Sequence, residues 1–425
     1  MNMQNQTFDV MVVLNTRYPF DHADPFLDNE LPYMKKYAKK IIFLPLGAKD
    51  CRYIQADLGN EVVAVPNLRE SLWTRGVTDV AALTRNSFWR EYRKYRKESN
   101  DLFSIVKILD HDAQFHRLRD IIRRILSVHI KDANAKVLFY AYWLDFCAHL
   151  AGDLKADYCN AVAISRAHGG DIYGEEQGDP YVPYRWECIN NLNAIYPVSD
   201  MGASYLAHRF PTMDIYCCRL GTQDRGINHL KLATPFTIVS CSSLISLKRV
   251  HLIIEALALC NKQIRWIHFG DGELRAALEQ QAKDLPEFVK WEFRGQISNA
   301  DLMKIYRELS IHMFINVSSS EGIPVSIMEA LSFGIPVMAT DVGGTKEAVL
   351  DGYNGRLLPA DITPAGLAQA IMDFRKELES FGEQYRNNAR ESWEKNYSAE
   401  KNYTDFYEKV YALHKEICGK RNSGA

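Results

Sequence analysis

Apolar and polar positions follow a regular rhythm through the second half of the chain. Short runs that are apolar throughout predict strands, and the stretches between them repeat apolar residues every three or four positions, which predicts helices. The predicted strands are FTIVSCSS, IRWIHFG, VKWEFRG, IHMFINV and IPVMAT, and the predicted helices are VHLIIEALAL, ELRAALEQQAKDL, NADLMKIYREL and VSIMEALSFG. This order, with strands apolar on both faces, is typical of an α/β fold with a parallel sheet.

The first half shows the same alternation of predicted strands and helices, with longer and more basic helical stretches. Its predicted strands are VMVVLN, KIIFLPL, KVLFYAY, YCNAVAIS and AIYPVSD. The pattern breaks in GINHLKLATP, where glycine, polar residues and proline follow one another. The sequence therefore predicts two Rossmann-like domains that face one another across a cleft, one over residues 1–228 and one over residues 229–395.

The C-terminal stretch, about residues 396–425, predicts further helices. After Ser398, a helix-capping residue, the apolar positions follow helical spacing and many are aromatic. They are Tyr403, Phe406, Tyr407, Val410, Tyr411, Leu413 and Ile417. A helix with so many aromatic residues is expected to dock on a folded domain.

The composition narrows the class of protein. The 425 residues are 47% apolar and 24% charged, as in a soluble globular protein, and a net charge of -2 gives no global reason to expect a nucleic-acid partner. The nine cysteines include no C-x-x-C pair, which argues against a zinc or redox motif and fits a reducing compartment. The N-terminus lacks the basic region of a signal peptide, so a cytoplasmic protein is expected.

The stretch SSSEGIPVSIME carries the main candidate site. It follows a predicted strand, and ligands of doubly wound sheets bind beyond the carboxyl ends of the strands. Gly322 lets a ligand approach the backbone, Pro324 suits a helix start, and the positive end of that helix would attract a diphosphate. Glu321 and Glu329 are about 12 Å apart along a helix, too far for the carboxylate pair of a retaining hydrolase. The spacing suits an elongated ligand held at both ends, or else a helix-start acid followed by a solvated glutamate.

The longer segment SSSEGIPVSIMEALSFGIPVMATDVGGTKEAV resembles the donor-binding segment of retaining GT-B glycosyltransferases of family 4. The resemblance implies that Glu321 contacts the transferred sugar and Glu329 the ribose. The residues that would hold sugar or phosphate are Gly322, Ile323, Pro324 and Val325, and the Gly-rich turn is Val342, Gly343 and Gly344. In the same resemblance, the C-terminal helices cross back to the first domain.

Two further segments resemble parts of the family's donor site. In SCSSLISLKRVHL, Lys248 stands at the position of a diphosphate-binding lysine, while Ser243 replaces the expected arginine and Arg249 is the candidate substitute. In HFGDGELR, Gly270 and Asp271 are expected in the cleft wall or in an ordinary capped turn. The nucleobase is expected against Gly295, Gln296 and Ile297, with UDP the expected nucleotide.

The first domain offers candidates of its own after the predicted strand AVAIS. His168 resembles the family histidine that reaches the donor sugar, although a lone histidine is often structural. Arg166 and Asp171 are expected to border the acceptor. Phe26, Asn29 and Glu30 resemble an acceptor-side segment of polysaccharide-assembling members, without assigned chemistry.

Two polar stretches have competing interpretations. DHD at residues 110–112 has the form of a metal-binding Asp-x-Asp, but its place between helical patterns favours a solvated turn. The basic region 89–131 places Arg and Lys among aromatic residues, which is open to two interpretations, a solvated helical surface or contact with the inner face of a membrane. A nucleic-acid site is disfavoured because no nucleic-acid motif accompanies it.

The resemblance implies a retaining hexosyltransferase, without metal or cofactor, that moves a sugar from a nucleotide sugar to a carbohydrate acceptor, free or polyprenyl-linked. Bacterial exopolysaccharide, capsule or O-antigen synthesis is the expected setting. Two alternatives remain. A nucleotide-sugar epimerase of the same fold would need no acceptor, and a degenerate binding scaffold would fit Ser243 in place of arginine.

Overall fold

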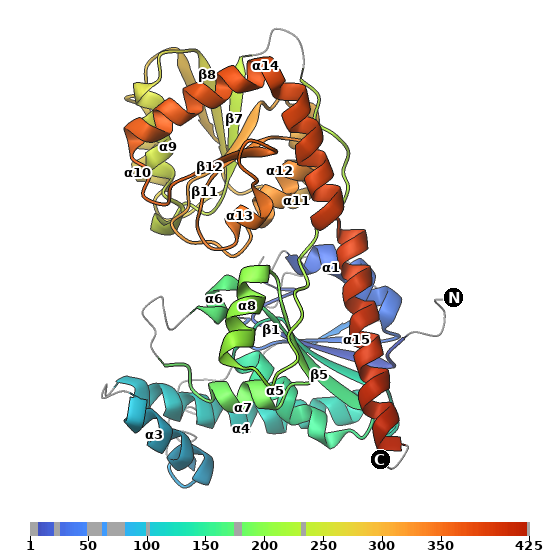
Figure 1. Ribbon diagram of the computed structural model, residues 1–425. Coiled ribbons are helices and arrows are strands. Elements are labelled where there is room, and N and C mark those ends of the chain that lie inside the picture. The colour runs from blue at the N-terminus through green and yellow to red at the C-terminus, as the bar shows by residue number, and fades with distance from the viewer. Residues whose placement is uncertain are drawn as a thin grey trace. The chain divides into compact units, whose positions relative to one another are not determined.

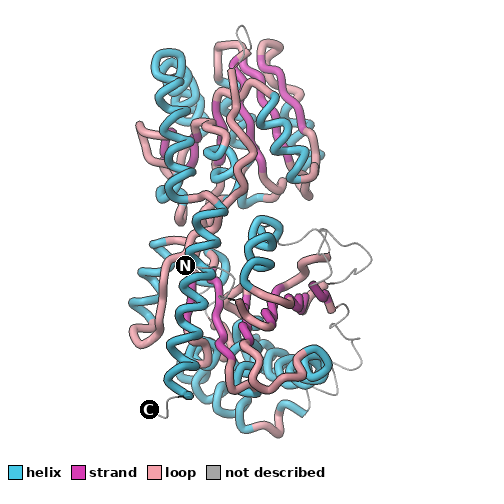
Figure 2. Tube along the Cα trace, turned by 90° about the vertical axis from the view of Figure 1, so that its right-hand side faces the viewer, coloured by secondary structure: helices cyan, strands magenta, loops and turns pink. Residues whose placement is uncertain are grey.

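The computed structural model divides the chain into two compact units. It describes residues 7–20, 26–48, 62–65, 81–98, 103–173, 181–230 and 235–422. The first unit holds Met1–Val198, Gly202–Cys218 and Tyr403–Ala425, and the second holds Ser199–Met201 and Arg219–Asn402. The predicted boundary between residues 228 and 229 therefore lies inside the second unit. Figure 1 shows the elements of each unit, and Figure 2 shows strands flanked by helices in both.

A parallel sheet of six strands forms the centre of the first unit, in the order β3-β2-β1-β4-β5-β6. The strands are β1 (Val10–Asn15), β2 (Ile41–Pro45), β3 (Val62–Ala64), β4 (Val137–Ala141), β5 (Ala161–Ala167) and β6 (Ala194–Pro197). Val12 pairs with Ile42 on one side and with Phe139 on the other. Because β1, β4 and β5 are buried along their whole length, helices must cover both faces.

The helices of the first unit are α1 (Phe26–Tyr37), α3 (Asn86–Glu98), α4 (Phe103–His129), α5 (Phe146–Leu154), η2 (Lys155–Asp157), α6 (Gly169–Ile172), α7 (Arg185–Asn190), α8 (Asp200–Arg209, which starts in the second unit) and α15 (Ala399–Asn422). Val12 and Phe139 point to one face of the sheet, where they share a core with Leu118 and Ile122 of α4. Tyr140 points to the other face, toward Phe406 of α15.

Helix α15 completes the first unit, which confirms that the C-terminal helix returns to the first domain. Its aromatic residues pack on α1, with Tyr37 stacked on Tyr407 at 5.3 Å between ring centroids. The hydroxyl of Tyr407 also donates to Glu30 Oε1 at 2.6 Å. No helix in the described part of the chain is both long and apolar enough to cross a membrane.

A second parallel sheet of six strands forms the other unit, in the order β12-β11-β10-β7-β8-β9. Its strands are β7 (Phe236–Cys241), β8 (Ile264–Phe269), β9 (Val289–Phe293), β10 (Met313–Asn316), β11 (Val337–Thr340) and β12 (Gly355–Leu358). Its helices are η3 (Ser246–Lys248), α9 (Val250–Leu259), α10 (Arg275–Ala282), α11 (Asn299–Glu308), α12 (Val325–Ser332), α13 (Thr345–Ala348) and α14 (Pro364–Asn396). The two sheets confirm the α/β fold class.

The DHD stretch does not form the expected solvated turn. Residues 110–112 lie within α4, and Asp112 is buried at 2% exposure. Its Oδ1 accepts hydrogen bonds from the hydroxyls of Ser87 and Tyr184, and its Oδ2 accepts one from Arg85. Asp112 therefore joins helices inside the first unit.

A buried histidine in the second sheet leads us to expect that the protein becomes less stable in acid. His268 lies between the Ser240 hydroxyl at 2.9 Å and the Ser242 carbonyl at 3.1 Å, and burial lowers its pKa to about 4. The unfolded state takes up the proton first, near pH 6.5, so stability should fall by about 1.4 kcal/mol per pH unit from there down to about pH 4. Urea denaturation of wild type and His268→Gln across this range should show a shallower slope for the variant. Equal slopes would contradict the assignment.

Candidate active site

The loop between β10 and α12 places Glu321 at the carboxyl edge of the second sheet. The helix begins at Val325 with Pro324 as its N-cap, so Glu321 lies in the loop ahead of the helix. The turn after β11 fixes this loop. A Cβ on Gly343, whose φ is +53°, would lie 1.8 Å from the Glu321 carbonyl oxygen, and the amide of Gly344 donates to the Gly322 carbonyl at 2.8 Å. Glycine is therefore required at position 343.

Three donors converge on one oxygen of the Glu321 carboxylate. Lys248 Nζ and Ser318 Oγ each donate to Oε1 at 2.6 Å, and Asn316 Nδ2 donates at 3.3 Å. The carboxylate side chain is 10% exposed and that of Lys248 is 20% exposed. Among the described residues, no hydrogen bond reaches Oε2. The arrangement holds the carboxylate in one orientation and leaves its second oxygen for a ligand.

Glu329 is buried in α12, unlike the solvated glutamate that was the alternative interpretation. Asn299 Nδ2 at the start of α11 donates to its Oε1 at 2.6 Å. Burial raises the pKa of Glu329 to about 7, and the Asn299 hydrogen bond partly offsets that increase. A buried carboxyl group that receives one hydrogen bond can accept further hydrogen bonds from the hydroxyl groups of a ligand.

The segment after β7 places Lys248 beside Glu321, whereas the side chain of the next residue, Arg249, binds backbone carbonyl groups. Arg249 has a left-handed backbone (φ +47°), and its guanidinium donates to the carbonyl oxygens of Val317, Ser318 and Ala360 at 2.7, 3.0 and 2.8 Å. It thus fixes the strand end that leads to Glu321. Ser243 is exposed in the loop after β7.

The other predicted donor-side residues lie in two turns that touch each other. The amide of Gly270 donates to the Gly295 carbonyl at 2.9 Å, and a Cβ on Gly270 (φ +126°) would lie 2.0 Å from the Ser242 carbonyl oxygen. Asp271 accepts from the Gly272 amide and from Arg275, so it acts at least as a turn cap. In the next loop Gln296 is exposed and Ile297 half-buried.

In the first unit, His168 and Asp171 begin the short helix α6. Asp171 Oδ1 accepts from the His168 amide at 2.5 Å, and its Oδ2 accepts from the Leu144 amide at 2.7 Å. Burial raises the pKa of Asp171 to about 7 and lowers that of His168 to about 3. His168 is therefore neutral at physiological pH, and its Nε2 lies 3.0 Å from the Tyr142 carbonyl, to which it donates.

Arg166 does not border an acceptor, because it is fully buried within β5. Its Nε donates to the Tyr140 hydroxyl at 3.1 Å, its Nη1 donates to the Cys218 carbonyl at 2.5 Å, and its guanidinium lies 3.8 Å from the Phe406 ring centroid. A 3.7 Å ion pair joins it to Glu30. Arg166 thus holds α15 on the sheet.

Three polar residues of the site were not predicted from the sequence. Asn316 ends β10, and Ser318 follows it in the loop that carries Glu321, so their position just before Glu321 in the sequence was a usable signal. Asn299 lies 30 residues from Glu329, and no local pattern connects the two. Among the described residues, no three His, Cys, Asp or Glu side chains are arranged to hold a metal ion.

Comparison with known proteins identifies the class of the second unit. Residues 225–392 match the family model described as "Glycosyl transferases group 1", so the chain contains a glycosyltransferase group 1 domain. The putative colanic acid biosynthesis glycosyltransferase WcaL of Escherichia coli is 29% identical over 223 residues, which is 49% of this chain and 53% of WcaL. The amylovoran biosynthesis glycosyltransferase AmsK of Erwinia amylovora is 28% identical over 222 residues, 48% of this chain and 52% of AmsK. The chain thus spans about half the length of these curated relatives.

A solved structure shows the fold of this chain. Anabaena Alr3699/HepE in complex with UDP matches 95% of this chain and 99% of its own, with a TM-score of 0.65 and 16% sequence identity. The protein therefore has the GT-B fold, as predicted.

The environment of Glu329 leads to a measurable pKa. The carboxyl group should titrate near pH 7 in NMR spectra of the protein with ¹³C-labelled glutamate, instead of near its ordinary 4.5. Asn299→Ala should move the pKa further up, because it removes the one donor that favours the ionised form. Glu308→Gln, an exposed residue at the other end of the same helix, is the control. A Glu329 that titrates below pH 5 would contradict the burial argument.

Proposed function

We propose that this protein is a retaining glycosyltransferase that uses a nucleotide sugar as donor. The observation that carries the proposal is the Glu321 carboxylate, held on one oxygen by Lys248, Ser318 and Asn316 at the strand edge of a glycosyltransferase group 1 domain. A fixed carboxylate beside a lysine suits a reaction in which positive charge develops on a sugar ring and negative charge on a leaving diphosphate.

In the proposed reaction, the bond between the anomeric carbon and the diphosphate oxygen breaks. The acceptor hydroxyl forms a bond to the same face of that carbon, and its proton passes to the departing diphosphate. Glu321 orients the sugar and stabilises the developing ring charge through Oε2. Lys248 stabilises the negative charge of the leaving group, so the proposal includes no metal or other cofactor.

Glu329 is proposed to bind the ribose hydroxyls, and UDP is the proposed nucleotide. Support comes from its buried carboxyl group and from the UDP complex of HepE, which has the same fold. The turns at Gly270 and Gly295 are proposed to line the base.

The acceptor is proposed to be a growing bacterial surface polysaccharide, as a free or lipid-linked glycan. The names of WcaL and AmsK, both polysaccharide biosynthesis glycosyltransferases, support this class. His168 is proposed to reach the donor sugar as a neutral hydrogen-bonding group, and Asp171 to fix the turn beside it. The proposed location is the cytoplasm.

Glu321→Gln should lower kcat/KM for sugar transfer by at least about 100-fold, because one electrostatic contact in the transition state is lost. Transfer from a radiolabelled UDP-sugar to a glycan acceptor measures the effect. Glu308→Gln, an exposed glutamate on α11, is the matched control and should retain wild-type activity. Full activity of Glu321→Gln would refute the catalytic role.

UDP should bind more tightly than GDP, ADP or CMP in calorimetric titrations, with a dissociation constant on the order of 10–100 μM. Because ionised Glu329 is the better acceptor for ribose hydroxyls, affinity should rise as pH increases through about 7. Glu329→Ala should bind more weakly and lose this pH dependence. Failure of all four nucleotides to bind would contradict the proposed nucleotide-sugar donor.

A further inference from the structure

Helix α3 turns a strongly basic face to solvent. Its exposed residues repeat at intervals of three or four positions, as one face of a helix requires. They are Asn86, Trp89, Arg90, Arg93, Arg96 and Lys97, which we call the α3 outer face. Among the α3 residues whose exposure the structure describes, this face contains cations and a tryptophan but no acid, although the whole chain has a net charge of -2.

The cations of the α3 outer face are largely uncompensated. Arg90 lies 3.5 Å from Glu187 with its side chain 61% exposed. In the part of the chain that the structure describes, Arg93, Arg96 and Lys97 form no ion pair. A row of cations with no ion pair to any described residue produces a local positive potential that the net charge of the chain conceals.

An apolar pair adjoins these cations. Trp89 is 42% exposed and Leu83, just before the helix, is 44% exposed. The indole Nε1 of Trp89 donates to the Leu83 carbonyl at 2.7 Å, so its polar edge is satisfied while the ring remains accessible. The ring also packs edge-on against Phe88 and Tyr92, and its remaining surface faces solvent. Tryptophan with a satisfied polar edge and a partly exposed ring is favoured at the boundary between water and lipid.

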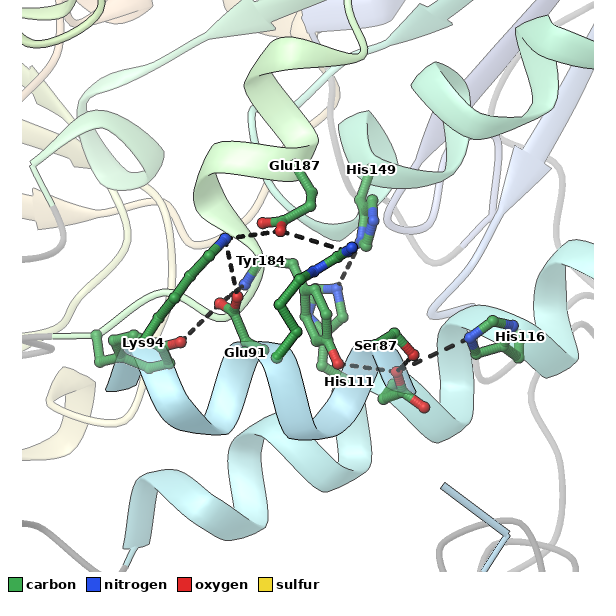
Figure 3. A network of polar contacts seen from close by, with 11 residues as sticks. Ser87, Glu91, Lys94, His111, His116, His149, Tyr184 and Glu187 are labelled. Atoms are coloured by element: carbon green, nitrogen blue, oxygen red, sulfur yellow. Dashed lines mark hydrogen bonds and ion pairs between the residues drawn. The ribbon is translucent and has the colours of Figure 1, made fainter. Parts of the chain in front are cut away.

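The inner side of α3 holds this surface in place through the network in Figure 3. Glu91 Oε1 accepts from the Tyr181 hydroxyl at 2.6 Å and from the Tyr184 amide at 2.5 Å. Lys94 donates to Glu187 at 2.7 Å, and Phe88 and Tyr95 are buried. The apolar side of the helix therefore packs inside the protein, and these contacts fix the direction in which the α3 outer face points.

We propose that the α3 outer face, with Leu83, docks on an anionic lipid bilayer. Lipid headgroups supply the negative charge that Arg93, Arg96 and Lys97 lack, and the interfacial zone accommodates Trp89 and Leu83. A nucleic-acid backbone would satisfy the cations but offers no apolar layer for the leucine. The inference rests on the proposed function, because an enzyme that uses a lipid-linked acceptor would bind it at a membrane surface. It can be tested without catalysis.

The test is sedimentation of the full-length protein with two kinds of vesicle. One kind is phosphatidylcholine alone, and the other contains roughly 40% phosphatidylglycerol, which gives it a strongly negative surface. Wild type should bind only the anionic vesicles, and more weakly as salt increases. Each cation near such a surface contributes about fivefold, so Arg93→Gln, Arg96→Gln and Lys97→Gln together should lower the partition coefficient about 100-fold. The control triple Lys262→Gln, Lys283→Gln and Lys290→Gln changes the net charge equally in the second unit and should bind as wild type does.

A second measurement tests the apolar part. Brominated phosphatidylglycerol should quench tryptophan fluorescence in wild type and quench it less in Trp89→Phe. Sugar transfer to a soluble acceptor should be unchanged in the α3 variants, so failed docking is distinguishable from failed catalysis. Absence of vesicle binding, equal loss in the control triple, or tighter binding to a DNA oligonucleotide than to anionic vesicles would each overturn the proposal.

Discussion

The close contact between two backbone turns determines the candidate active site. The carbonyl of Glu321 lies where a side chain at Gly343 would have to be, so the loops after β10 and β11 can only move together. Lys248 follows β7, the strand on the other side of β10 in the sheet. Three neighbouring strand ends therefore position one carboxylate, which explains why residues distant in the sequence contribute to it.

The first unit depends on a comparable constraint, a buried charge. Glu30 is fully buried, and it is stabilised by hydroxyl groups of Tyr140 and Tyr407 and by the guanidinium of Arg166. Removing one partner of such a group leaves an uncompensated charge, which is far more costly than losing an exposed ion pair. Because Tyr407 belongs to α15, the last helix is part of the first unit's core.

The sequence predicted most strands of both sheets because apolar runs report burial directly. It missed β12, whose GRLL run is short, and β3, which has three residues. Glu321 could be proposed from the sequence because it belongs to a recognisable motif at a strand end, and its role there stays a prediction. Arg166 was misplaced because its neighbour His168 suggested a shared surface, whereas Arg166 lies within β5 and points into the interior. The Asn299 contact depends on tertiary packing, so no local pattern could reveal it.

Burial of the two carboxyl groups, Glu321 and Glu329, is compensated to different extents. Glu321 receives its compensation within the protein, from a lysine and two neutral donors. Glu329 has one amide donor, which offsets burial only in part, so burial still raises its pKa to about 7. A ligand with two adjacent hydroxyl groups would supply the missing donors and favour the ionised form. On the proposed function, binding of a nucleotide near neutral pH is therefore coupled to release of a proton from Glu329, because whatever stabilises the carboxylate must lower its pKa.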